Sequence, residues 1–394
     1  MFYYLSQWLL DWSDGTEWAD RLSALRLFRY ITIRAAGAAV TALLLSWWLG
    51  PRIIAWLKRL NLEQEYKDAA ETQGNLTARG DKKKGTPIMG GLLIVLVLHL
   101  TTVLWAQWST LILVTLLSVL VLTALGFYDD FAKITKQNSA GLSETVKLVV
   151  QFSLAIFIGV YLWNLPMVSY LRIPESHSML TSNLVSVMML PVYKYPVHVG
   201  AVLGVLLVTF TIVGSSNAVN LTDGLDGLAI GCTLIVTLVF VVFTYVCGHA
   251  EISRYLQMPH VVGAGELTVF CAALFGASMG FLWFNCHPAQ VFMGDTGSLA
   301  LGGALGIVAV LIHQPFVLVI AGGVFVVEAL SVLLQRGWFR YTRRRTGTGR
   351  RIFLMAPIHH HFEKKGWHES QVVTRFYILC VLFAVLALST LKIR

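Results

Sequence analysis

The feature that most limits the fold of this chain is a series of ten long apolar runs separated by shorter polar stretches. Most are about 16–20 residues long, near the length an α-helix needs to cross the ~30 Å hydrocarbon core of a bilayer. The chain is 56% hydrophobic and only 13% charged, and a water-soluble core has no use for so many such runs. The alternating ten-residue segments of a membrane β-barrel are absent from the sequence. The pattern predicts an all-α, polytopic integral membrane protein with about ten transmembrane helices.

The predicted spans are Ala35–Leu57, Ile88–Trp105, Leu111–Phe127, Leu148–Trp163, Val199–Val219, Leu228–Cys247, Leu267–Phe284, Leu299–Ile312, Phe316–Leu334 and Phe376–Leu391. Together they form one integral membrane domain, residues 35–394. Residues 1–34 mix tryptophans with acidic and basic residues, and we expect them to form an interfacial amphipathic segment that leads into the first span.

The distribution of Lys and Arg predicts how these spans are oriented. Twenty of these residues lie in the loops after odd-numbered spans, and only Arg172, Lys194 and Arg254 lie in the loops after even-numbered spans. Loops rich in Lys and Arg stay on the cytoplasmic side. We therefore expect the odd loops to be cytoplasmic and both termini to face the other side. Six basic residues outside the first and last spans oppose this assignment without outweighing it.

The polar motifs suited to chemistry all fall in the odd loops, so they share one face of the membrane. The first, GFYDDFAK, ends the third span with the adjacent carboxylates of Asp129 and Asp130. Adjacent carboxylates repel unless a cation lies near them, which indicates a metal ion or a raised pKa. The alternative is an ordinary solvated helix end, where Asp129 pairs with Lys133 one turn further on.

A second motif, NLTDGLDG, follows the fifth span. Its carboxylates, Asp223 and Asp226, are three residues apart and share one face if the segment is helical. Its glycines let a ligand approach the backbone, and the next span begins there with N–H groups that favour an anion. A polar turn with Asp223 as the N-cap of the sixth span would explain that residue, but not Asn220 and Asp226 as well.

The third acidic motif lies between Asn285 and Ser298, after the seventh span. Asp295, within VFMGDTGS, is a hard oxygen ligand suited to Mg²⁺, and the hydroxyls of Thr296 and Ser298 are close by in sequence. A helix cap is the alternative role for Asp295. Phe292 suits either a buried core or stacking on a nucleotide base.

Two further motifs carry basic or imidazole side chains. KKGTPIMGG, which contains Lys84 and Thr86, is basic and glycine-rich and suits phosphate binding, although lysines there also serve as a topology signal. His359, His360 and His361 are consecutive and cannot all point one way, and an HExxH motif is absent. A three-histidine zinc site is therefore not expected, and we interpret these imidazoles as neighbours of a diphosphate.

Net charge and cysteine content constrain the function less. The net charge of +9 fits topology signals and contact with lipid head groups as well as an anionic substrate. The five cysteines are scattered and form no CxxC pair, so neither a disulfide framework nor a zinc knuckle is predicted. His99 and Glu328 lie inside predicted spans, where we expect them to be packed and hydrogen-bonded.

Five motifs in order, KKGTPIMGG, GFYDDFAK, NLTDGLDGLA, VFMGDTGSLALG and MAPIHHHFE, resemble those of the polyprenyl-phosphate N-acetylhexosamine-1-phosphate transferases. The His-His-His-Phe-Glu form resembles the phospho-N-acetylmuramoyl-pentapeptide transferase branch rather than the N-acetylglucosamine branch. The resemblance covers about Lys58 to the C-terminus. It does not account for residues 1–34 or for the loop 164–196.

This resemblance implies a reaction in peptidoglycan synthesis. A Mg²⁺-dependent enzyme of this kind transfers phospho-N-acetylmuramoyl-pentapeptide from UDP-N-acetylmuramoyl-pentapeptide to undecaprenyl phosphate, giving lipid I and UMP. The resemblance also implies a multi-pass protein of the bacterial inner (cytoplasmic) membrane, in contact with the lipid bilayer, with its active site on the cytoplasmic face. It allows a homodimer, and no nucleic-acid partner is expected.

Matching the family motifs to this sequence also implies the site residues. Asp295 is the expected metal ligand, and Asp129 and Asp130 are the expected acidic pair near the lipid phosphate, so these three are the catalytic candidates. The expected substrate-binding residues, near the nucleotide or the phosphates, are Lys84, Thr86, Lys133, Lys147, Asn220, Asp223, Asp226, Asn285, Phe292, His359, His360 and His361. The lipid phosphate has a second pKa of about 6 and is mostly dianionic at neutral pH. The choice between a general base and a covalent Asp nucleophile therefore stays open.

Three other functions compete with this interpretation. A related transferase of N-acetylglucosamine-1-phosphate differs only in its donor. A transporter would place its polar residues mid-span along a path, whereas here most lie at one surface. A CDP-alcohol phosphotransferase also has paired aspartates beside its spans, but its motif adds an Arg after DGxxA, where this chain has Ile230 after Ala229.

Overall fold

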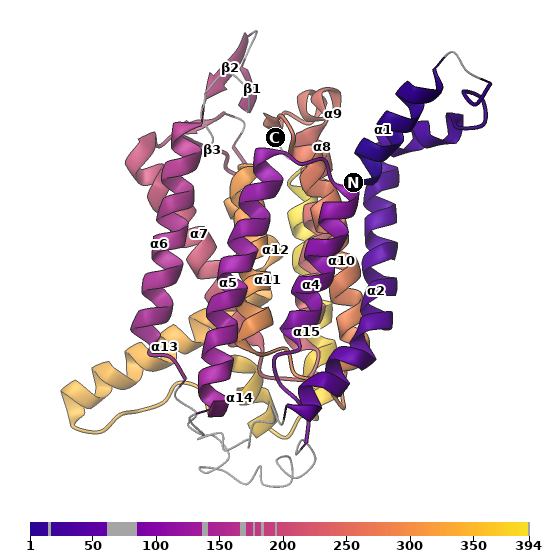
Figure 1. Cartoon of the computed structure of the whole chain (residues 1–394). Helices are drawn as coiled ribbons and strands as arrows, with labels where there is room; N and C mark the ends of the chain where they lie inside the picture. Colours follow the sequence, from indigo (N-terminus) through magenta and orange to yellow (C-terminus); the bar gives the residue numbers. More distant parts are fainter. Residues whose placement is uncertain are drawn as a thin grey trace.

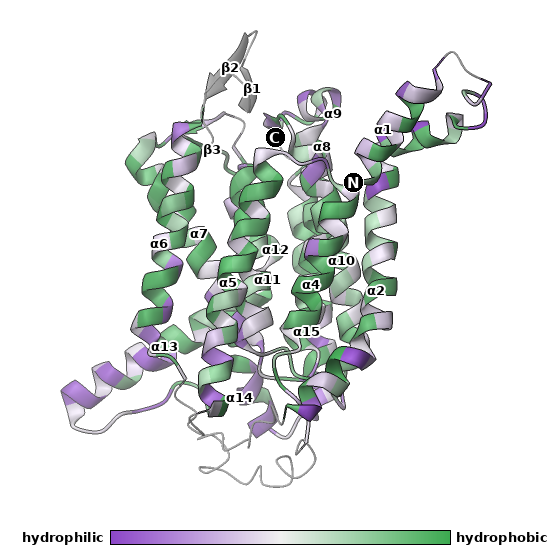
Figure 2. Cartoon of the chain, viewed as in Figure 1, coloured by the Kyte–Doolittle hydropathy of each residue, from purple (hydrophilic) through white to green (hydrophobic). Residues whose placement is uncertain are grey.

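The computed structural model describes residues 1–14, 17–60, 85–135, 141–165, 171–175, 178–182, 185–193 and 195–392. This part of the chain forms a bundle of long, roughly parallel helices with both termini at the same end (Figure 1). We call that end the terminal end and the opposite one the site end. Apolar residues occupy the middle of the helices and hydrophilic residues lie mainly at both ends of the bundle (Figure 2), as a bilayer-spanning bundle requires.

Each predicted span corresponds to helical structure at nearly the expected position. The helices are α1 Phe2–Ser13, the 3-10 helix η1 Ser23–Arg29, α2 Ile31–Arg59, α4 Gly91–Trp105, α5 Thr110–Thr135, α6 Glu144–Asn164, α7 Gly200–Thr222, α8 Leu228–Gly248, α9 Ala250–Tyr255, α10 Ala264–Asn285, α11 Gly294–Leu311, α12 Pro315–Ala321, α13 Gly323–Thr346, α14 Ile358–Lys364 and α15 Glu369–Ser389. Eight helices of the described residues are long and apolar enough to cross a bilayer, and α4 is a shorter apolar helix of 15 residues. The chain is therefore a polytopic helical membrane protein, as predicted.

The predicted ninth span, Phe316–Leu334, consists of two helices in the structure. Helices α12 and α13 meet at Gly322 and Gly323, and their axes differ by 83°. Sharp helix breaks concentrate where small residues such as glycine leave the backbone unrestricted. Helix α13 consequently runs across the site end and protrudes from the bundle (Figure 1).

Helices α10 and α11 form the centre of the bundle and are mostly buried. Helix α10 packs against α2 and α8, and α11 packs against α5 and α7. The sequence of α11, GDTGSLALGGALGIVAVL, is rich in Gly and Ala, which lets neighbouring helices approach closely. The first turn of α11, which carries Asp295, therefore lies in the middle of the site end.

Short strands occur at the terminal end. Strand β1 Leu171–Glu175 pairs antiparallel with β2 Ser178–Ser182 and with β5 His260–Val261, and β3 Val187–Met188 pairs with β4 Val197–His198. These strands fall mainly within the loop 164–196, for which the motifs gave no role. They leave the helical fold class unchanged and lie away from the site end (Figure 1).

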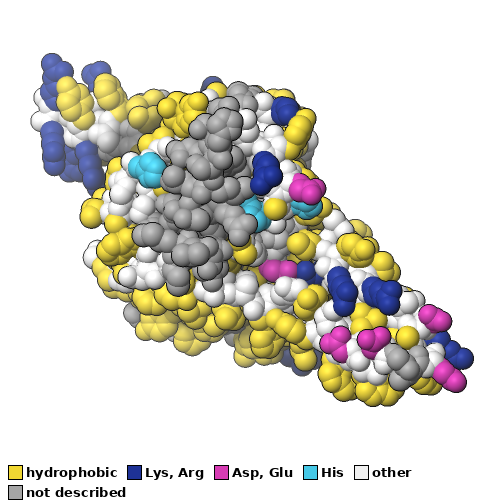
Figure 3. All heavy atoms as spheres, turned by 90° about the horizontal axis from the view of Figure 1, so that it is seen from above, with side chains coloured by type: hydrophobic (Ala, Val, Ile, Leu, Met, Phe, Trp, Pro, Cys, Tyr) yellow, Lys and Arg dark blue, Asp and Glu magenta, His cyan; other side chains and the backbone are white. Residues whose placement is uncertain are grey.

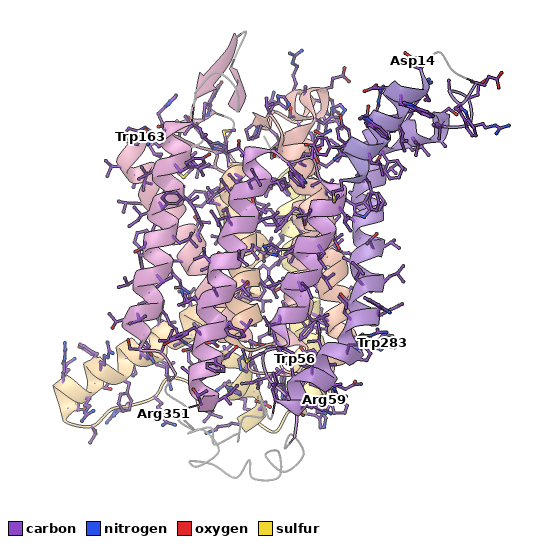
Figure 4. The ribbon with its side chains drawn as sticks, viewed as in Figure 1. Asp14, Trp56, Arg59, Trp163, Trp283 and Arg351 are labelled. Atoms are coloured by element: carbon purple, nitrogen blue, oxygen red, sulfur yellow. The ribbon has the colours of Figure 1, made fainter. Side chains whose placement is uncertain are left out.

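Exposed tryptophans mark two levels of the bundle. Trp163 lies near the terminal end, whereas Trp56 and Trp283 lie near the site end (Figure 4). Tryptophan is enriched at the two membrane–water interfaces, so these levels fit the edges of the hydrocarbon layer. Arg59 and Arg351 lie further out at the site end (Figure 4), which agrees with the predicted basic loops on that face.

The N-terminal segment projects from the terminal end (Figure 1). Arg34 was predicted to precede the first span, but it lies inside α2, which begins at Ile31. Its Nη1 and Nη2 donate to Glu266 Oε2 and Oε1 at 2.6 and 2.7 Å, and both side chains are buried. Arg34 is therefore neutralised within the bundle and is not a loop charge that opposes the orientation.

Candidate active site

The motifs predicted from the sequence meet at the site end. Helices α5 and α7 end there and α6 and α11 begin there, because consecutive spans run in opposite directions (Figure 1). Close packing of α5 on α11 depends on Gly126, where a β-carbon would collide with the Asp295 carbonyl oxygen. The glycine before the acidic pair thus brings the two acidic motifs together.

Three carboxylates and two ammonium groups form what we call the lysine-bridged cluster: Asp129, Asp130, Asp295, Lys133 and Lys147. Lys147 Nζ lies 2.7 Å from both Asp129 Oδ2 and Asp295 Oδ2. Lys133 Nζ lies 2.7 Å from Asp129 Oδ2 and 3.2 Å from Asp295 Oδ2. It also lies 3.7 Å from Asp130 Oδ1. The i,i+4 pair considered as an alternative is present, but as one part of a larger, mostly buried cluster.

Asp130 caps the start of α11. Its Oδ2 accepts hydrogen bonds from the Thr296 backbone N–H at 2.9 Å and the Thr296 hydroxyl at 2.6 Å. Its Oδ1 accepts from the Asp295 backbone N–H at 3.2 Å. A carboxylate is favoured there by the N–H groups and dipole of the helix N-terminus. The capping role considered for Asp295 therefore belongs to Asp130.

The Asp295 carboxylate faces the lysines on one side and Asn220 on the other. Asn220 Nδ2 donates to Asp295 Oδ1 at 2.9 Å and to Ser298 Oγ at 2.8 Å. The Asp295 side chain is 17% exposed, against 0% for Asp129 and 3% for Asp130. Asp295 is thus the most accessible carboxylate of the cluster.

A cavity of about 120 Å³ opens beside the cluster. Its lining includes the predicted residues Asp130, Lys133, Asn220, Asp223, Asp226, Asn285, Phe292 and Asp295. Asp129 is not among the described residues that line this cavity. Eight of the predicted site residues, taken from three separate motifs, therefore surround one space, and Asp129 contacts Lys133 of its lining.

The donor set of the cluster fits a hard divalent cation. Oxygen atoms of Asp129, Asp130 and Asp295 lie within 4.8 Å of one another, and carboxylate oxygens are the ligands that Mg²⁺ prefers. Three carboxylates and two ammonium groups leave one net negative charge. One divalent ion would turn this into one net positive charge, which suits a cavity for anionic phosphates.

A second group, which we call the histidine-bridged cluster, consists of Asp226, His287 and Glu369. His287 Nδ1 lies 3.0 Å from Asp226 Oδ2 and 3.5 Å from Glu369 Oε2. The Asp226 backbone N–H donates to Glu369 Oε1 at 3.0 Å, and the Ala289 backbone N–H donates to Asp226 Oδ2 at 3.3 Å. The cluster joins the NLTDGLDG loop to the loop after α10 and to the start of α15. Sequence reasoning assigned no role to His287 or Glu369.

Asn285 is also engaged in holding loops together. Its Oδ1 accepts from the Gly227 backbone N–H at 3.1 Å, and its Nδ2 donates to the Val291 carbonyl at 2.9 Å. Its side chain is buried although it borders the cavity. The predicted contact of Asn285 with substrate remains a prediction, and its observed bonds shape the cavity wall.

Phe292 borders the same cavity and is partly exposed. Its backbone N–H donates to the Pro87 carbonyl at 2.9 Å, and its carbonyl accepts from the Gly90 N–H at 2.8 Å. These bonds attach the GTPIMGG segment to the loop before Asp295. Thr86 precedes Pro87 in this segment but is not among the described residues that line the cavity. Lys84 lies outside the described residues.

The three consecutive histidines point to different partners. His359 is fully buried with Nδ1 3.1 Å from Glu328 Oε1 of α13. His360 Nδ1 lies 2.7 Å from Glu363 Oε2, and His361 Nδ1 accepts from the Leu354 backbone N–H at 3.1 Å. Desolvation and the nearby Lys365 ammonium lower the pKa of the His361 imidazole, so it is neutral at neutral pH.

His359 and His360 also adjoin the cavity loop. A β-carbon at Gly224 would collide with the His359 imidazole, so α14 supports the loop that carries Asp223. Glu328, expected to be packed, is buried against His359. No sequence signal connected it to the histidine motif, because the two residues belong to different helices.

Comparison with known proteins agrees with these motifs. The family model for glycosyl transferase family 4 matches residues 112–313. Phospho-N-acetylmuramoyl-pentapeptide-transferase from Methylacidiphilum infernorum is 48% identical over 377 residues, which cover 95% of this chain and 97% of that protein. The protein of the same name from Opitutus terrae is 47% identical over 378 residues, covering 95% and 98% of the two chains. The one from Neisseria meningitidis serogroup C (strain 053442) is 47% identical over 389 residues, covering 98% and 99%.

The similarity therefore extends beyond the five motifs to almost the whole chain, including most of the N-terminal segment. The motif resemblance drawn from the sequence is confirmed. This chain belongs to the phospho-N-acetylmuramoyl-pentapeptide transferases of glycosyl transferase family 4.

Proposed function

We propose that this protein transfers phospho-N-acetylmuramoyl-pentapeptide from UDP-N-acetylmuramoyl-pentapeptide to undecaprenyl phosphate, with lipid I and UMP as products. The observation that carries the proposal is the lysine-bridged cluster at the edge of a cavity, in a chain of this family. Its carboxylates and lysines come from α5, α6 and α11. They supply the charges that a reaction between two phosphates requires.

The reaction mainly requires that the two phosphates be aligned and that their negative charge be neutralised. An oxygen of the lipid phosphate forms a bond to the sugar-linked phosphorus, the bond from that phosphorus to the bridging oxygen breaks, and UMP leaves with that oxygen. Phosphoryl transfer depends on alignment and neutralisation more than on covalent help from the protein. Lys133, on the cavity wall, and Lys147 behind it would offset phosphate charge, while Asn220 and Asp130 keep Asp295 in place.

Mg²⁺ is the ion we propose for the lysine-bridged cluster, with Asp295 as its ligand. A bound Mg²⁺ neutralises charge that develops on the phosphoryl oxygens. Titration with Mn²⁺, followed by electron paramagnetic resonance, tests the site without turnover. The native protein should bind the ion and Asp295→Asn should not. Equal binding by both proteins would remove Asp295 as the ligand.

We propose direct attack by the acceptor phosphate, without a covalent enzyme intermediate. The phosphate monoester is mostly dianionic at neutral pH, Asp129 is fully buried, and Asp130 uses both oxygens to cap α11. Protein incubated with labelled donor but no acceptor should release far less than one UMP per molecule. A stoichiometric burst of UMP would establish the covalent route instead.

An apolar groove of about 330 Å³ offers a place for the polyprenyl chain of the acceptor. Residues of α7, α12 and the start of α13 line it. At one end it includes Leu207 and Pro315, and at the other it includes Val219, the neighbour of Asn220. A lipid chain in this groove would bring its phosphate to the level of the lysine-bridged cluster.

We propose that the site end faces the cytoplasm and that the protein belongs to the bacterial inner membrane. The basic loops at that end support this through the positive-inside rule. Cys286 is exposed beside the site, and the other four cysteines are buried. A membrane-impermeant maleimide should therefore label inside-out vesicles but not intact spheroplasts. The reverse result would place the site on the outer face.

The activity itself is tested with purified protein, UDP-N-acetylmuramoyl-pentapeptide, undecaprenyl phosphate and Mg²⁺. We expect UMP release that requires both substrates. UDP-N-acetylglucosamine in place of the first donor tests the alternative transferase, and we expect no release with it. Release with UDP-N-acetylglucosamine alone would overturn the donor assignment.

A further inference from the structure

A second and larger cavity, of about 570 Å³, lies at the site end between α13, the segment 351–356 and α14. Four basic residues line it, Arg336, Arg340, Arg351 and Lys364, against a single acidic residue, Glu144. Apolar side chains such as Phe339 and Met355 supply the rest of the wall. This volume lies within the range of small-molecule sites, about 300–1,000 Å³. The lining suits an anion with apolar parts.

Hydrogen bonds hold the walls of this cavity in place. Gln335 Oε1 accepts from the Ile352 and Phe353 backbone N–H groups at 3.0 Å each, and its Nε2 donates to the Phe353 carbonyl at 3.0 Å. The Leu354 N–H donates to His361 Nδ1 at 3.1 Å, which attaches the same segment to α14. The cavity is therefore a built space between three elements and not a gap beside a loose loop.

The cavity opens on the side of α13 away from lipid. At 100° per residue, the cavity residues of α13 centre on Phe339, while its exposed apolar residues, such as Leu330, Leu334 and Tyr341, lie on the opposite face. Beyond the cavity, α13 continues to a basic end that protrudes past the outline of the bundle, at the upper left of Figure 3. The apolar stripe fits contact with the bilayer, so the cavity side faces water.

The cavity adjoins the lysine-bridged cluster. Glu144 lies in the first turn of α6, three residues before Lys147, which corresponds to about 4.5 Å along the helix. Lys364 ends α14, the helix that carries the histidines. A group attached to the sugar whose phosphate is held at the cluster would reach the cavity without crossing lipid.

We propose that this cavity binds the peptide of the donor substrate through the carboxylates of that peptide, a subsite that rests on the proposed function. Arginine guanidinium groups bind carboxylates with paired, charge-assisted hydrogen bonds. Arg336 lies 3.4 Å from Glu144, but both side chains are largely exposed, 62% and 80%. Such a pair contributes little, so Arg336 can exchange Glu144 for a substrate carboxylate. The apolar wall then receives the peptide side chains.

The test compares three donors with the purified protein in nanodiscs: UDP-N-acetylmuramoyl-pentapeptide, the same donor with its peptide carboxylates amidated, and UDP-N-acetylmuramic acid without peptide. In Arg336→Ala/Arg340→Ala we expect KM for the full donor to rise about tenfold, with little change for the other two donors. Arg345→Ala is the matched control, because Arg345 lies on the same helix, off the cavity face, next to Tyr341. It should leave all three donors unchanged.

Three outcomes would overturn the subsite while leaving the proposed function intact. In a variant that melts at the native temperature, the first is an equal rise in KM with all three donors and the second is no rise with any donor. The third is a rise in KM that depends on the anionic lipid content of the nanodisc, which would assign the cavity to a lipid head group. Failure of the native protein to use any donor would instead overturn the proposed function.

Discussion

The lysine-bridged and histidine-bridged clusters hold similar residues at the same end of the molecule, yet they are built for different tasks. In the first, Asp130 accepts from backbone N–H groups, but Asp295 faces the ammonium groups of Lys133 and Lys147 and keeps some exposure. In the second, Asp226 and Glu369 accept from backbone N–H groups of distant loops. A carboxylate whose oxygens fasten backbone segments gives rigidity, whereas one balanced by side-chain cations can exchange a partner for a ligand.

This difference separates Asp295 from Asp226, although both border the small cavity. Residue type and spacing in the sequence do not distinguish the roles of these two aspartates. The assignment of chemistry to one and scaffolding to the other depends on where their oxygens are already used. The following predictions test that assignment, beginning with the largest expected loss of activity.

Asp295→Asn should have the largest effect. The substitution keeps the shape of the side chain and an acceptor for Asn220, but it removes the charge that faces the lysines and the proposed ion. We expect transfer to fall at least about 1,000-fold, equivalent to about 4 kcal/mol in the activation barrier. UMP release by the purified variant measures it. Ser298→Ala, which removes only a hydroxyl bonded to Asn220, is the control and should lose less than about tenfold.

Lys147→Met should have the next largest effect. It removes the ammonium group shared by Asp129 and Asp295 and leaves Asp129 with Lys133. We expect turnover to fall about 100-fold and stability to fall by about 1–3 kcal/mol, less than for a fully buried pair because Lys147 keeps some exposure. Thermal unfolding in detergent measures the second quantity.

The double variant Lys147→Met/Asp295→Asn sharpens this prediction. Residues that act as one unit show non-additive losses, so the pair should lose little more than Asp295→Asn alone. Additive losses would mean that the lysine and the carboxylate serve separate steps.

His287→Ala should have a smaller effect on activity than either change. It removes the bridge between Asp226 and Glu369 but leaves their backbone hydrogen bonds. We expect a stability loss of about 1–2 kcal/mol and a turnover loss below about tenfold. A loss as large as that of Asp295→Asn, with normal stability, would contradict the division between the clusters and indicate a second reactive site at Asp226, His287 and Glu369.

Much of this arrangement follows from the sequence because spans alternate in direction. Once the apolar runs are counted, Asp129, Asp223 and Asp295 must fall at one end, and the structure places them there. The glycines next to them, such as Gly126, also predict close packing of neighbouring segments, since another backbone can approach closely only where a side chain is missing.

Other contacts could not be predicted, because they join residues that no local pattern connects. Lys147 and Asp295 are 148 residues apart. Only the family resemblance marked Lys147, because by position alone it is an ordinary loop charge before the predicted fourth span, whereas in the structure it lies in α6. Glu328 reads as a polar residue within a span, and only the break at Gly322 turns α13 so that Glu328 faces His359. The length of an apolar run can be read from the sequence. The angle between two helices within that run cannot, because it depends on tertiary packing.

The smallest effect on activity is expected from a change in the buried charge pair at the terminal end. Arg34 and Glu266 bond through two hydrogen bonds, and Glu266 Oε2 also accepts from the Gln107 backbone N–H at 2.7 Å. Arg34→Met leaves Glu266 buried without its cation, a change that costs about 3–5 kcal/mol. We expect a clearly lower melting temperature, yet less than a twofold change in turnover well below that temperature, because no described contact of this pair reaches the site end.

Arg34→Met/Glu266→Leu should recover most of the stability, since a matched apolar pair replaces the ions. If Arg34→Met instead reduced turnover as much as Lys147→Met in fully folded protein, charge at the terminal end would be coupled to the reaction, and burial with internal bonding would no longer separate scaffolding from catalytic clusters in this molecule.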